Sequence, residues 1–172
     1  MRCFLYEIMM DFRIGHGVDI HKLKKNIPLI LGGVTIESSY GIEGHSDGDV
    51  LIHSIVDAIL GSVSLGDIGT YFSSNNQKWK NCKSQIFLEH AMKKLGECNF
   101  IICNLDCTII LESPQLNPYI QNIRQHLSKL INIPIDYISI KATTTDKLGF
   151  IGKKEGVAAM ASVLVKKKSN DN

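Results

Sequence analysis

The chain has 172 residues, of which 44% are hydrophobic and 21% are charged, and its formal net charge is +2. This length and composition are typical of one globular domain with a substantial core. The net charge is too small to indicate a nucleic-acid partner, and no apolar stretch approaches the roughly 18 residues that a membrane span needs. We therefore expect one domain that binds neither nucleic acid nor a membrane.

The two ends of the chain indicate no targeting segment. Residues 1–12 contain Glu7 and lack a small-residue cleavage site, so a secretory signal is not predicted. The five cysteines are odd in number and form no C-x-x-C pair, which favours a reducing compartment. We expect an N-terminal extension over 1–12, one catalytic domain over 13–166 and a polar tail over 167–172. The expected location is the bacterial cytoplasm, or a plastid only if a transit peptide has been removed.

The first predicted strand, Arg13 to His21, places two metal-ligand residue types on one face. Residues alternate between the two faces of a strand, so Asp19 and His21 project from the same side about 7 Å apart at the backbone. Those side chains can converge on one ion, although such a pair alone is more often a polar strand end in solvent. Leu29 to Ile36 is predicted as a second strand with a glycine pair at its middle, and Ser38 to Gly44 as a loop.

The stretch from His45 to Gly69 carries the strongest functional pattern. Apolar residues at helical spacing predict a helix from about Asp49 to Val63. Asp49, His53 and Asp57 are four residues apart and would form a polar line along that helix. A buried structural histidine would explain His53 alone, but two carboxylates in register with it favour a site.

The remaining segments complete an alternation of helices and strands. The polar stretch after Gly69 is predicted as a surface loop anchored by Tyr71 and Phe72. The other predicted elements are a helix from Ser84, as N-cap, to Cys98; a strand over Phe100–Leu111 with Ile101, Cys103, Leu105, Cys107, Ile109 and Leu111 on one face; a helix from Asn117-Pro118 to Ile131; and strands over Ile138–Ala142 and Gly156–Lys166.

The last strand decides the predicted architecture. Its sequence, GVAAMASVLVK, is apolar on both faces, and such a strand must be covered on both sides. Three modest helices are too few to cover both faces of the sheet. We predict a single α+β domain whose mixed four-stranded sheet, with additional short strands, carries helices on one face and packs its other face in a homotrimer.

A second polar centre lies between the last two strands, in the sequence KATTTDKLGF from Lys141 to Phe150. Its threonines and lysines offer donors to phosphate, and Asp146 offers a carboxylate to magnesium. Composition alone makes this a weak signal, because threonine is also a common strand residue.

Taken in order, Asp19-x-His21, HSDGDVLIH from His45 to His53, LGDIG from Leu65 to Gly69 and KATTTDKLGF resemble the 2-C-methyl-D-erythritol 2,4-cyclodiphosphate synthases. These are the ring-closing, CMP-releasing phosphorus–oxygen lyases of non-mevalonate isoprenoid biosynthesis. The resemblance extends from Arg13 to about Lys166. It implies a homotrimer with active sites at the subunit boundaries. The implied substrate is 4-diphosphocytidyl-2-C-methyl-D-erythritol 2-phosphate, and the products are CMP and the cyclic diphosphate.

The resemblance also implies two metal sites. The zinc ligands match Asp19, His21 and His53, with one Zn²⁺ per subunit and a fourth position open, as in catalytic zinc sites. A Mg²⁺ or Mn²⁺ ion bridging the substrate diphosphate would be held by Asp146, where many relatives have glutamate.

The resemblance also implies contacts to four parts of the substrate and to a separate isoprenoid diphosphate. His45 and Ser46 match donors to the attacking phosphate, and Asp57 matches an acid beside the metal site. His45, Thr144 and Asp57 are the implied catalytic residues. The other implied contacts are Asp67, Ile68, Gly69 and Phe72 for the methylerythritol part; Thr143, Thr144 and Thr145 for the phosphates; Ser113, Pro114, Gln115, Leu116 and Ala142 for cytidine; and Phe150 and Lys153 for an isoprenoid diphosphate on the trimer axis, with Lys153 replacing an arginine and Gln115 replacing a lysine.

Two other functions remain open from the sequence. A metal phosphohydrolase would use the same ions to activate water. A non-catalytic trimer would bind isoprenoid diphosphates around Phe150 without releasing CMP.

Overall fold

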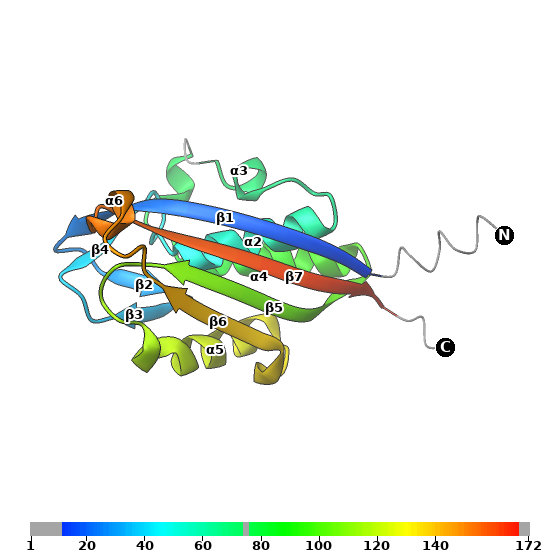
Figure 1. Ribbon diagram of the computed structural model, residues 1–172. Coiled ribbons are helices and arrows are strands. Elements are labelled where there is room, and N and C mark those ends of the chain that lie inside the picture. The colour runs from blue at the N-terminus through cyan, green and yellow to red at the C-terminus, as the bar shows by residue number, and fades with distance from the viewer. Residues whose placement is uncertain (1–11, 74–75, 169–172) are drawn as a thin grey trace.

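In the computed structural model, which describes residues 12–73 and 76–168, one mixed sheet carries helices on one of its faces (Figure 1). The sheet has five strands in the order β4-β1-β7-β5-β6, and a separate hairpin pairs β2 with β3. The strands are β1 Phe12–Lys25, β2 Leu29–Leu31, β3 Val34–Ile36, β4 Tyr40–Glu43, β5 Phe100–Ile110, β6 Ile138–Thr143 and β7 Gly156–Lys167. The helices are α2 Val50–Ser62, α3 Ile68–Tyr71, α4 Gln85–Glu97, α5 Asn117–Ile131 and α6 Gly149–Gly152, with short 3-10 turns at Gln77–Trp79 and Ile135–Tyr137.

The pairing of the strands makes the sheet mixed, as predicted. β1 pairs antiparallel with both β4 and β7, and β5 pairs antiparallel with β7 but parallel with β6. The outer strand β6 therefore lies three strand spacings from β1, which is roughly 14 Å across the sheet. Side chains on β1 and β6 consequently belong to opposite halves of the molecule.

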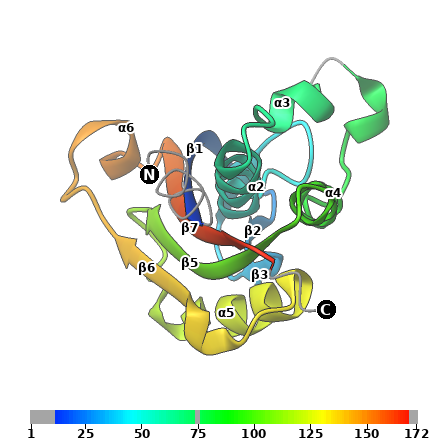
Figure 2. The same ribbon diagram turned by 90° about the vertical axis from the view of Figure 1, so that its right-hand side faces the viewer.

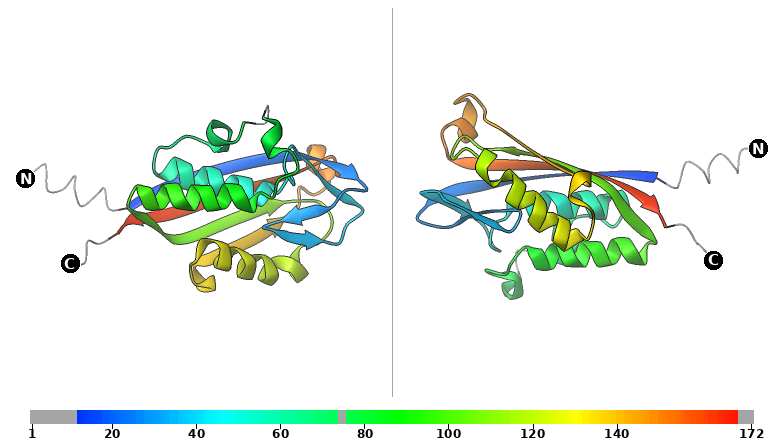
Figure 3. Two further views of the ribbon diagram at one scale, coloured as in Figure 1. Left: turned by 180° about the vertical axis from the view of Figure 1, so that it is seen from behind. Right: turned by 90° about the horizontal axis from the view of Figure 1, so that it is seen from below.

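The three long helices lie on the same side of the sheet, as the view along the strands shows (Figure 2). Helix α2 packs on β1 and β7, α4 on β5, and α5 on β6. The view from behind shows these helices in front of the strands (Figure 3). The opposite face exposes large apolar side chains, including Ile14 at 75%, Ile20 at 55% and Val18 at 43%. Exposed apolar side chains gathered on one face are typical of a contact with another molecule.

Helix α2 lies in the core, and the backbone of β1 approaches it without intervening side chains. A Cβ at Gly15 would lie 1.7 Å from the Ala58 carbonyl oxygen, and one at Gly17 would lie 2.1 Å from that of Ser54. Only glycine permits this approach of two backbones. The contact brings the middle of β1, with Asp19 and His21, beside the helix that carries His53.

Two strand predictions were wrong around the first loop. The predicted single strand at 29–36 is a hairpin, because Gly32 and Gly33 have φ values of 58° and 75° and form its two-residue turn. The predicted loop at 38–44 contains β4, which pairs with the second half of β1. The sheet therefore has a fifth, short strand at the edge beside the candidate site.

The predicted face of the strand at 100–111 was also partly wrong. The register with β7 shifts between Ile102 and Asn104, which is a β-bulge. The extra residue reverses the alternation, so Ile102 is buried and Ile101 is 37% exposed. The prediction had placed Ile101 on the same face as Leu105, which is buried.

Ser84 is the N-cap of α4, as predicted, although its side chain makes no capping hydrogen bond in that helix. Helix α5 begins at Asn117 after Leu116, with the proline in its first turn. The predicted extension at 1–12, except Phe12, and most of the tail at 167–172 lie outside the described residues. In the described part of the chain, no helix has both the length and the apolar character for crossing a membrane.

Candidate functional site

Asp19, His21 and His53 converge at the junction of β1 and α2. The Asp19 Oδ2 atom lies 2.8 Å from His21 Nε2 and 3.0 Å from His53 Nδ1. One ligand atom from each residue lies within 4.8 Å of the others. The two residues predicted to share a strand face therefore meet the histidine predicted on the helix.

We call the side chains of Asp19, His21 and His53 the metal cluster, because they could share one metal ion. Each imidazole of this metal cluster is oriented by a second hydrogen bond. His21 directs Nδ1 at the Glu43 carbonyl oxygen, 3.1 Å away, which leaves Nε2 facing Asp19. His53 directs Nε2 at the hydroxyls of Ser84 and Ser46, at 2.9 and 3.1 Å, which leaves Nδ1 facing Asp19. Protein ligands of metal ions are typically oriented in this way.

The charges of the cluster reinforce this arrangement. Burial alone would raise the pKa of Asp19, but the hydrogen bonds from His21 and His53 outweigh it and hold that pKa well below its ordinary value. The hydrogen bond to Asp19 raises the pKa of His21, despite the opposing effect of burial. The carboxylate thus remains ionised at neutral pH and available to a cation.

The donor set fits a zinc ion. Two imidazole nitrogens and one carboxylate oxygen are ligands that zinc accepts, and three protein ligands leave one tetrahedral position for substrate. The other ring nitrogen of each histidine already has a hydrogen-bond partner. The nitrogen that faces the cluster can therefore present the lone pair that a metal ion needs. A divalent metal ion can therefore be held by this chain alone.

His45 and Ser46, the residues predicted to donate hydrogen bonds to the attacking phosphate, lie on the loop before α2. The Ser46 hydroxyl is buried and accepts a hydrogen bond from the Gly48 amide at 3.3 Å. The His45 ring lies 3.1 Å from the Asn76 carbonyl oxygen. Ser46 therefore faces the metal cluster, and His45 joins this loop to the segment before α4.

Asp57 fixes the loop that contains Asp67 and Ile68. Its Oδ1 atom accepts the Ile68 amide at 2.8 Å, and Asp67 caps α3 by accepting from Thr70 at 2.9 Å. Burial raises the pKa of Asp57, although the Ile68 amide opposes the shift. The structure thus brings Asp57 together with the predicted methylerythritol contacts Asp67, Ile68 and Gly69. Phe72 follows α3 and packs on Phe87 with ring centroids 4.4 Å apart.

Asp49 does not belong to this site, contrary to the predicted polar line. It is fully buried and accepts hydrogen bonds from the backbone amides of Gly32, Gly33 and Ile52. Its carboxylate caps α2 and fastens the β2–β3 turn to the helix. Its role is structural.

The predicted cytidine residues form a separate pocket at the far edge of the sheet. This cavity of about 130 Å³ is lined by the segment after β5 and the end of β6, including Pro114, Gln115, Leu116, Ala142, Thr143 and Thr144. Ser113 directly precedes this lining. Because β6 and β1 are at opposite halves of the sheet, the pocket and the metal cluster of one chain are separate.

The remaining predicted residues follow β6. Asp146 is exposed in the turn after this strand, and its amide donates to the Thr144 hydroxyl at 3.3 Å. Thr145 closes the same turn through the Leu148 carbonyl oxygen. Phe150 lines a cavity of about 550 Å³ with Ile20, His21, Lys22, Glu155 and Gly156, whereas Lys153 follows α6 outside that lining.

The comparison with family models decides the family. The model of the YgbB family matches residues 12–166, which is nearly the whole described chain. The chain belongs to the YgbB family.

Relatives of this YgbB-family chain carry consistent names. A 2-C-methyl-D-erythritol 2,4-cyclodiphosphate synthase of Leptospira interrogans is 47% identical over 160 residues, which are 92% of this chain and 99% of the relative. Two solved structures are also similar. The bifunctional IspDF of Campylobacter jejuni has a TM-score of 0.89 and 41% identity over 92% of this chain, which spans only 43% of that protein. IspF of Plasmodium falciparum, solved as a CDP complex, has a TM-score of 0.82 and 39% identity over 93% of this chain and 99% of that one.

Sequence reasoning missed three contributors to the site of this YgbB-family chain. Ser84 and the Glu43 carbonyl orient the two histidines, and the Phe87 ring lies 5.9 Å from that of His53. Ser84 and Phe87 are more than thirty residues from His53 in the sequence. No local spacing links them to it.

Proposed function

We propose that this chain is a 2-C-methyl-D-erythritol 2,4-cyclodiphosphate synthase of isoprenoid biosynthesis. It converts 4-diphosphocytidyl-2-C-methyl-D-erythritol 2-phosphate into the 2,4-cyclodiphosphate and CMP. An oxygen of the 2-phosphate attacks the β-phosphorus, and the bond from that phosphorus to the CMP oxygen breaks, so the reaction is that of a phosphorus–oxygen lyase. The convergence of Asp19, His21 and His53 in a YgbB-family fold carries this proposal.

One zinc ion per subunit would be held by Asp19, His21 and His53. When bound, the ion supplies a Lewis acid that polarises a phosphoryl oxygen. The protein residues mainly position the two phosphates, because an oriented intramolecular attack can gain about 7–11 kcal/mol over free encounter. Charge stabilisation and positioning account for most phosphoryl-transfer catalysis.

The residues beside the cluster, and those at and after the end of β6 in a second chain, would hold the reacting groups. His45 and Ser46 donate to the attacking 2-phosphate. Asp57 holds the loop of Asp67, Ile68 and Gly69 so that it can contact the methylerythritol hydroxyls, with Phe72 beside it. Thr143, Thr144 and Thr145 would donate to the diphosphate, and Asp146 would hold a Mg²⁺ or Mn²⁺ ion that neutralises its charge.

We further propose that the working enzyme is a homotrimer with sites at the subunit boundaries. Within one chain, the metal cluster and the pocket for cytidine lie at opposite halves of the sheet, so one site needs two chains. The exposed apolar face of β1 and β7 supports such packing. The CDP in the Plasmodium falciparum structure supports cytidine binding, with Ser113, Pro114, Gln115, Leu116 and Ala142 as the contacts.

The cavity beside Phe150 is a candidate for an isoprenoid diphosphate on the trimer axis. Ile20 and Phe150 supply its apolar wall, and Lys22 lies at its rim. Lys153, just after α6, would add positive charge for the diphosphate. Because the relatives include bacterial enzymes, we propose that the protein acts in the cytoplasm. The proposed catalytic domain spans residues 13–166.

CMP release from the cytidine substrate tests the proposed function. The wild type should release CMP and the cyclic product, a chelator should abolish release, and added zinc should restore it. Asp19→Ala should lower the rate at least about 100-fold, because it removes one of the three residues that would hold the ion. Reaction in ¹⁸O-labelled water distinguishes the alternative, since a phosphohydrolase places solvent oxygen in its phosphate product and a cyclase does not.

A further inference from the structure

Ser84 and Asp47 form a hydrogen-bonded chain behind the metal cluster. Ser84 is fully buried just before α4, and its hydroxyl lies 2.9 Å from His53 Nε2. The carboxylate of Asp47 accepts both the Ser84 hydroxyl and, at 3.0 Å, the Ser84 amide. The loop before α2 and the start of α4 are therefore joined at the side of His53 that faces away from Asp19.

The chemistry of these groups fixes the direction of each bond. An ionised carboxylate only accepts hydrogen bonds, so the Ser84 hydroxyl donates to Asp47. The Ser84 oxygen then accepts from His53, and this places the ring proton on Nε2. The lone pair of Nδ1 is left to face Asp19 and His21, as a metal ligand requires.

A neighbouring serine does not replace this connection. The Ser46 hydroxyl lies 3.1 Å from His53 Nε2, slightly farther than that of Ser84, and it already accepts from the Gly48 amide. It makes no hydrogen bond to a carboxylate among the described residues. Within residues 12–73 and 76–168, only Ser84 hydrogen-bonds both His53 Nε2 and a carboxylate, and this connection makes the imidazole a stronger electron donor.

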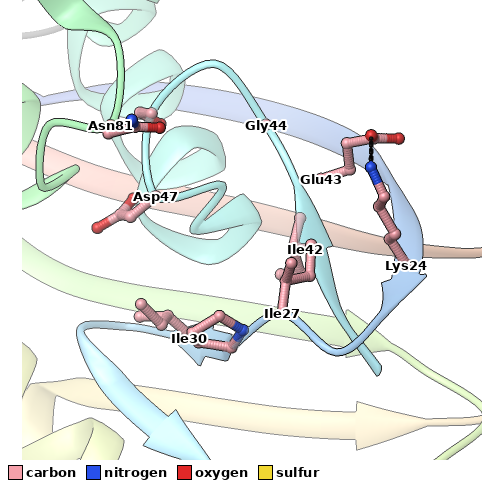
Figure 4. Close-up of a pocket in the computed structure, with 10 residues that line it drawn as sticks. Lys24, Ile27, Ile30, Ile42, Glu43, Gly44, Asp47 and Asn81 are labelled. Carbon is pink, nitrogen blue, oxygen red and sulfur yellow. Dashed lines mark hydrogen bonds and ion pairs between the residues drawn. The ribbon is translucent and has the colours of Figure 1, made fainter. Parts of the chain in front are cut away.

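The outer end of the chain of bonds is held open to solvent. Asp47 is half-buried and lines a cavity of about 360 Å³ between the loop before α2 and the start of the β2–β3 hairpin. Asp47 and Asn81 lie on one side of this cavity and the Lys24–Glu43 ion pair on the other (Figure 4). The Asp47 amide also donates to the Cys82 carbonyl oxygen at 3.0 Å, which fixes its backbone.

We propose that Asp47 and Ser84 are positioning residues that hold His53 in its metal-binding tautomer and strengthen it as a ligand. The inference rests on the proposed zinc site, but it concerns residues that none of the predicted contacts includes. Loss of such a supporting hydrogen bond typically weakens metal binding by about 10–100-fold.

The test is the affinity of the full-length protein for Zn²⁺ alone, measured by competition with a chromophoric chelator. Ser84→Ala and Asp47→Asn should each raise the Kd at least about 10-fold. Ser62→Ala is the matched control, because Ser62 is also a buried serine but its hydroxyl donates to the Ile59 carbonyl oxygen within α2. Its Kd for Zn²⁺ should equal that of the wild type.

A spectroscopic measurement separates positioning from general loss of structure. The zinc-loaded wild type should show a slowly exchanging, downfield proton on His53 Nε2 in NMR spectra, and Ser84→Ala should lose it. If Ser84→Ala does not fold, Asp47→Asn decides the question by both measurements. Zinc affinities within about twofold of the wild type in both variants would overturn the proposal, and an effect of Ser84→Ala alone would overturn the role of Asp47. A wild type that binds no zinc would instead overturn the metal site of the proposed function.

Discussion

The carboxylate of Asp19 contacts both imidazoles of the metal cluster, so its charge affects how the metal-free protein responds to pH. The pKa of Asp19 is lowered from an ordinary value of 3.8, and that of His21 is raised from 6.5. The Asp19 contribution to stability is present above pH 3.8 and is lost as the pH falls through its lowered pKa. The His21 contribution is complete below pH 6.5 and is lost as the pH rises through its raised pKa.

We therefore expect Asp19→Asn to destabilise the metal-free protein most between about pH 4 and 6.5. For a partly exposed pair the loss should be about 1 kcal/mol, which lowers the Tm by about 2–4 °C in a chain of this size. Thermal unfolding in the presence of a chelator, from pH 3.5 to 8.5, measures the difference. It should shrink toward alkaline pH, and a difference that stays constant over the whole range would contradict the assignment.

At the scale of elements, the approach of β1 to α2 determines the geometry of the cluster. Two ligands come from the strand and one from the helix, and the glycines at 15 and 17 allow the backbones to meet. Anything that separates the two elements also separates the ligands. Stability and metal affinity are therefore coupled through this contact.

Gly17→Ala tests this coupling. The new Cβ would lie 2.1 Å from the Ser54 carbonyl oxygen, so the helix must move. We expect a loss of about 1–3 kcal/mol in the free energy of unfolding and a weaker affinity for Zn²⁺. Gly61→Ala is the control, because it lies in α2 with no atom within 4 Å of the new Cβ. This control should be neutral or more stable by up to about 1 kcal/mol. Denaturant unfolding and zinc titration give both quantities, and an unchanged zinc affinity in Gly17→Ala would refute the coupling.

The same elements explain how far the sequence predicts this molecule. Local periodicity is enough for α2, α4, α5 and the long strands, because each buries one regular face. It does not reveal the turn at Gly32–Gly33, where the hydrophobic run continues through the hairpin, or the bulge near Cys103, which one inserted residue creates. The convergence of Asp19, His21 and His53 could be predicted because a strand pair and a helix position match a recognisable family. The contact of Ser84 with His53 could not be predicted, because it depends on how α4 packs against α2.

At the scale of the whole molecule, two features favour assembly with a second chain. One is the face of the sheet that no helix covers, and the other is the separation of the metal cluster from the proposed cytidine pocket. The apolar side chains of β1 and β7 are exposed in one chain, and the pocket with Gln115 lies far from the metal cluster. A second chain covering this face would remove the apolar surface from water and bring a second half-site to the first. The metal cluster itself is complete within one chain, so assembly and metal binding are separable.

Ile14→Asp separates these two properties. Ile14 is 75% exposed on the sheet face, and burying a charge there costs several kcal/mol, so we expect monomers in place of trimers. CMP release should fall at least about 100-fold, whereas the Kd for Zn²⁺ should stay within about twofold of the wild type. Light scattering coupled to gel filtration measures the assembly.

Ile86→Asp is the matched control for this change. Ile86 is 44% exposed on α4, on the helical side of the sheet, so the variant should remain trimeric and active. A monomeric Ile14→Asp that retains full activity would show that one chain holds a complete site. An Ile14→Asp that stays trimeric would show that another surface makes the contact. Loss of both assembly and turnover with zinc affinity retained is expected only if the two half-sites come from different chains.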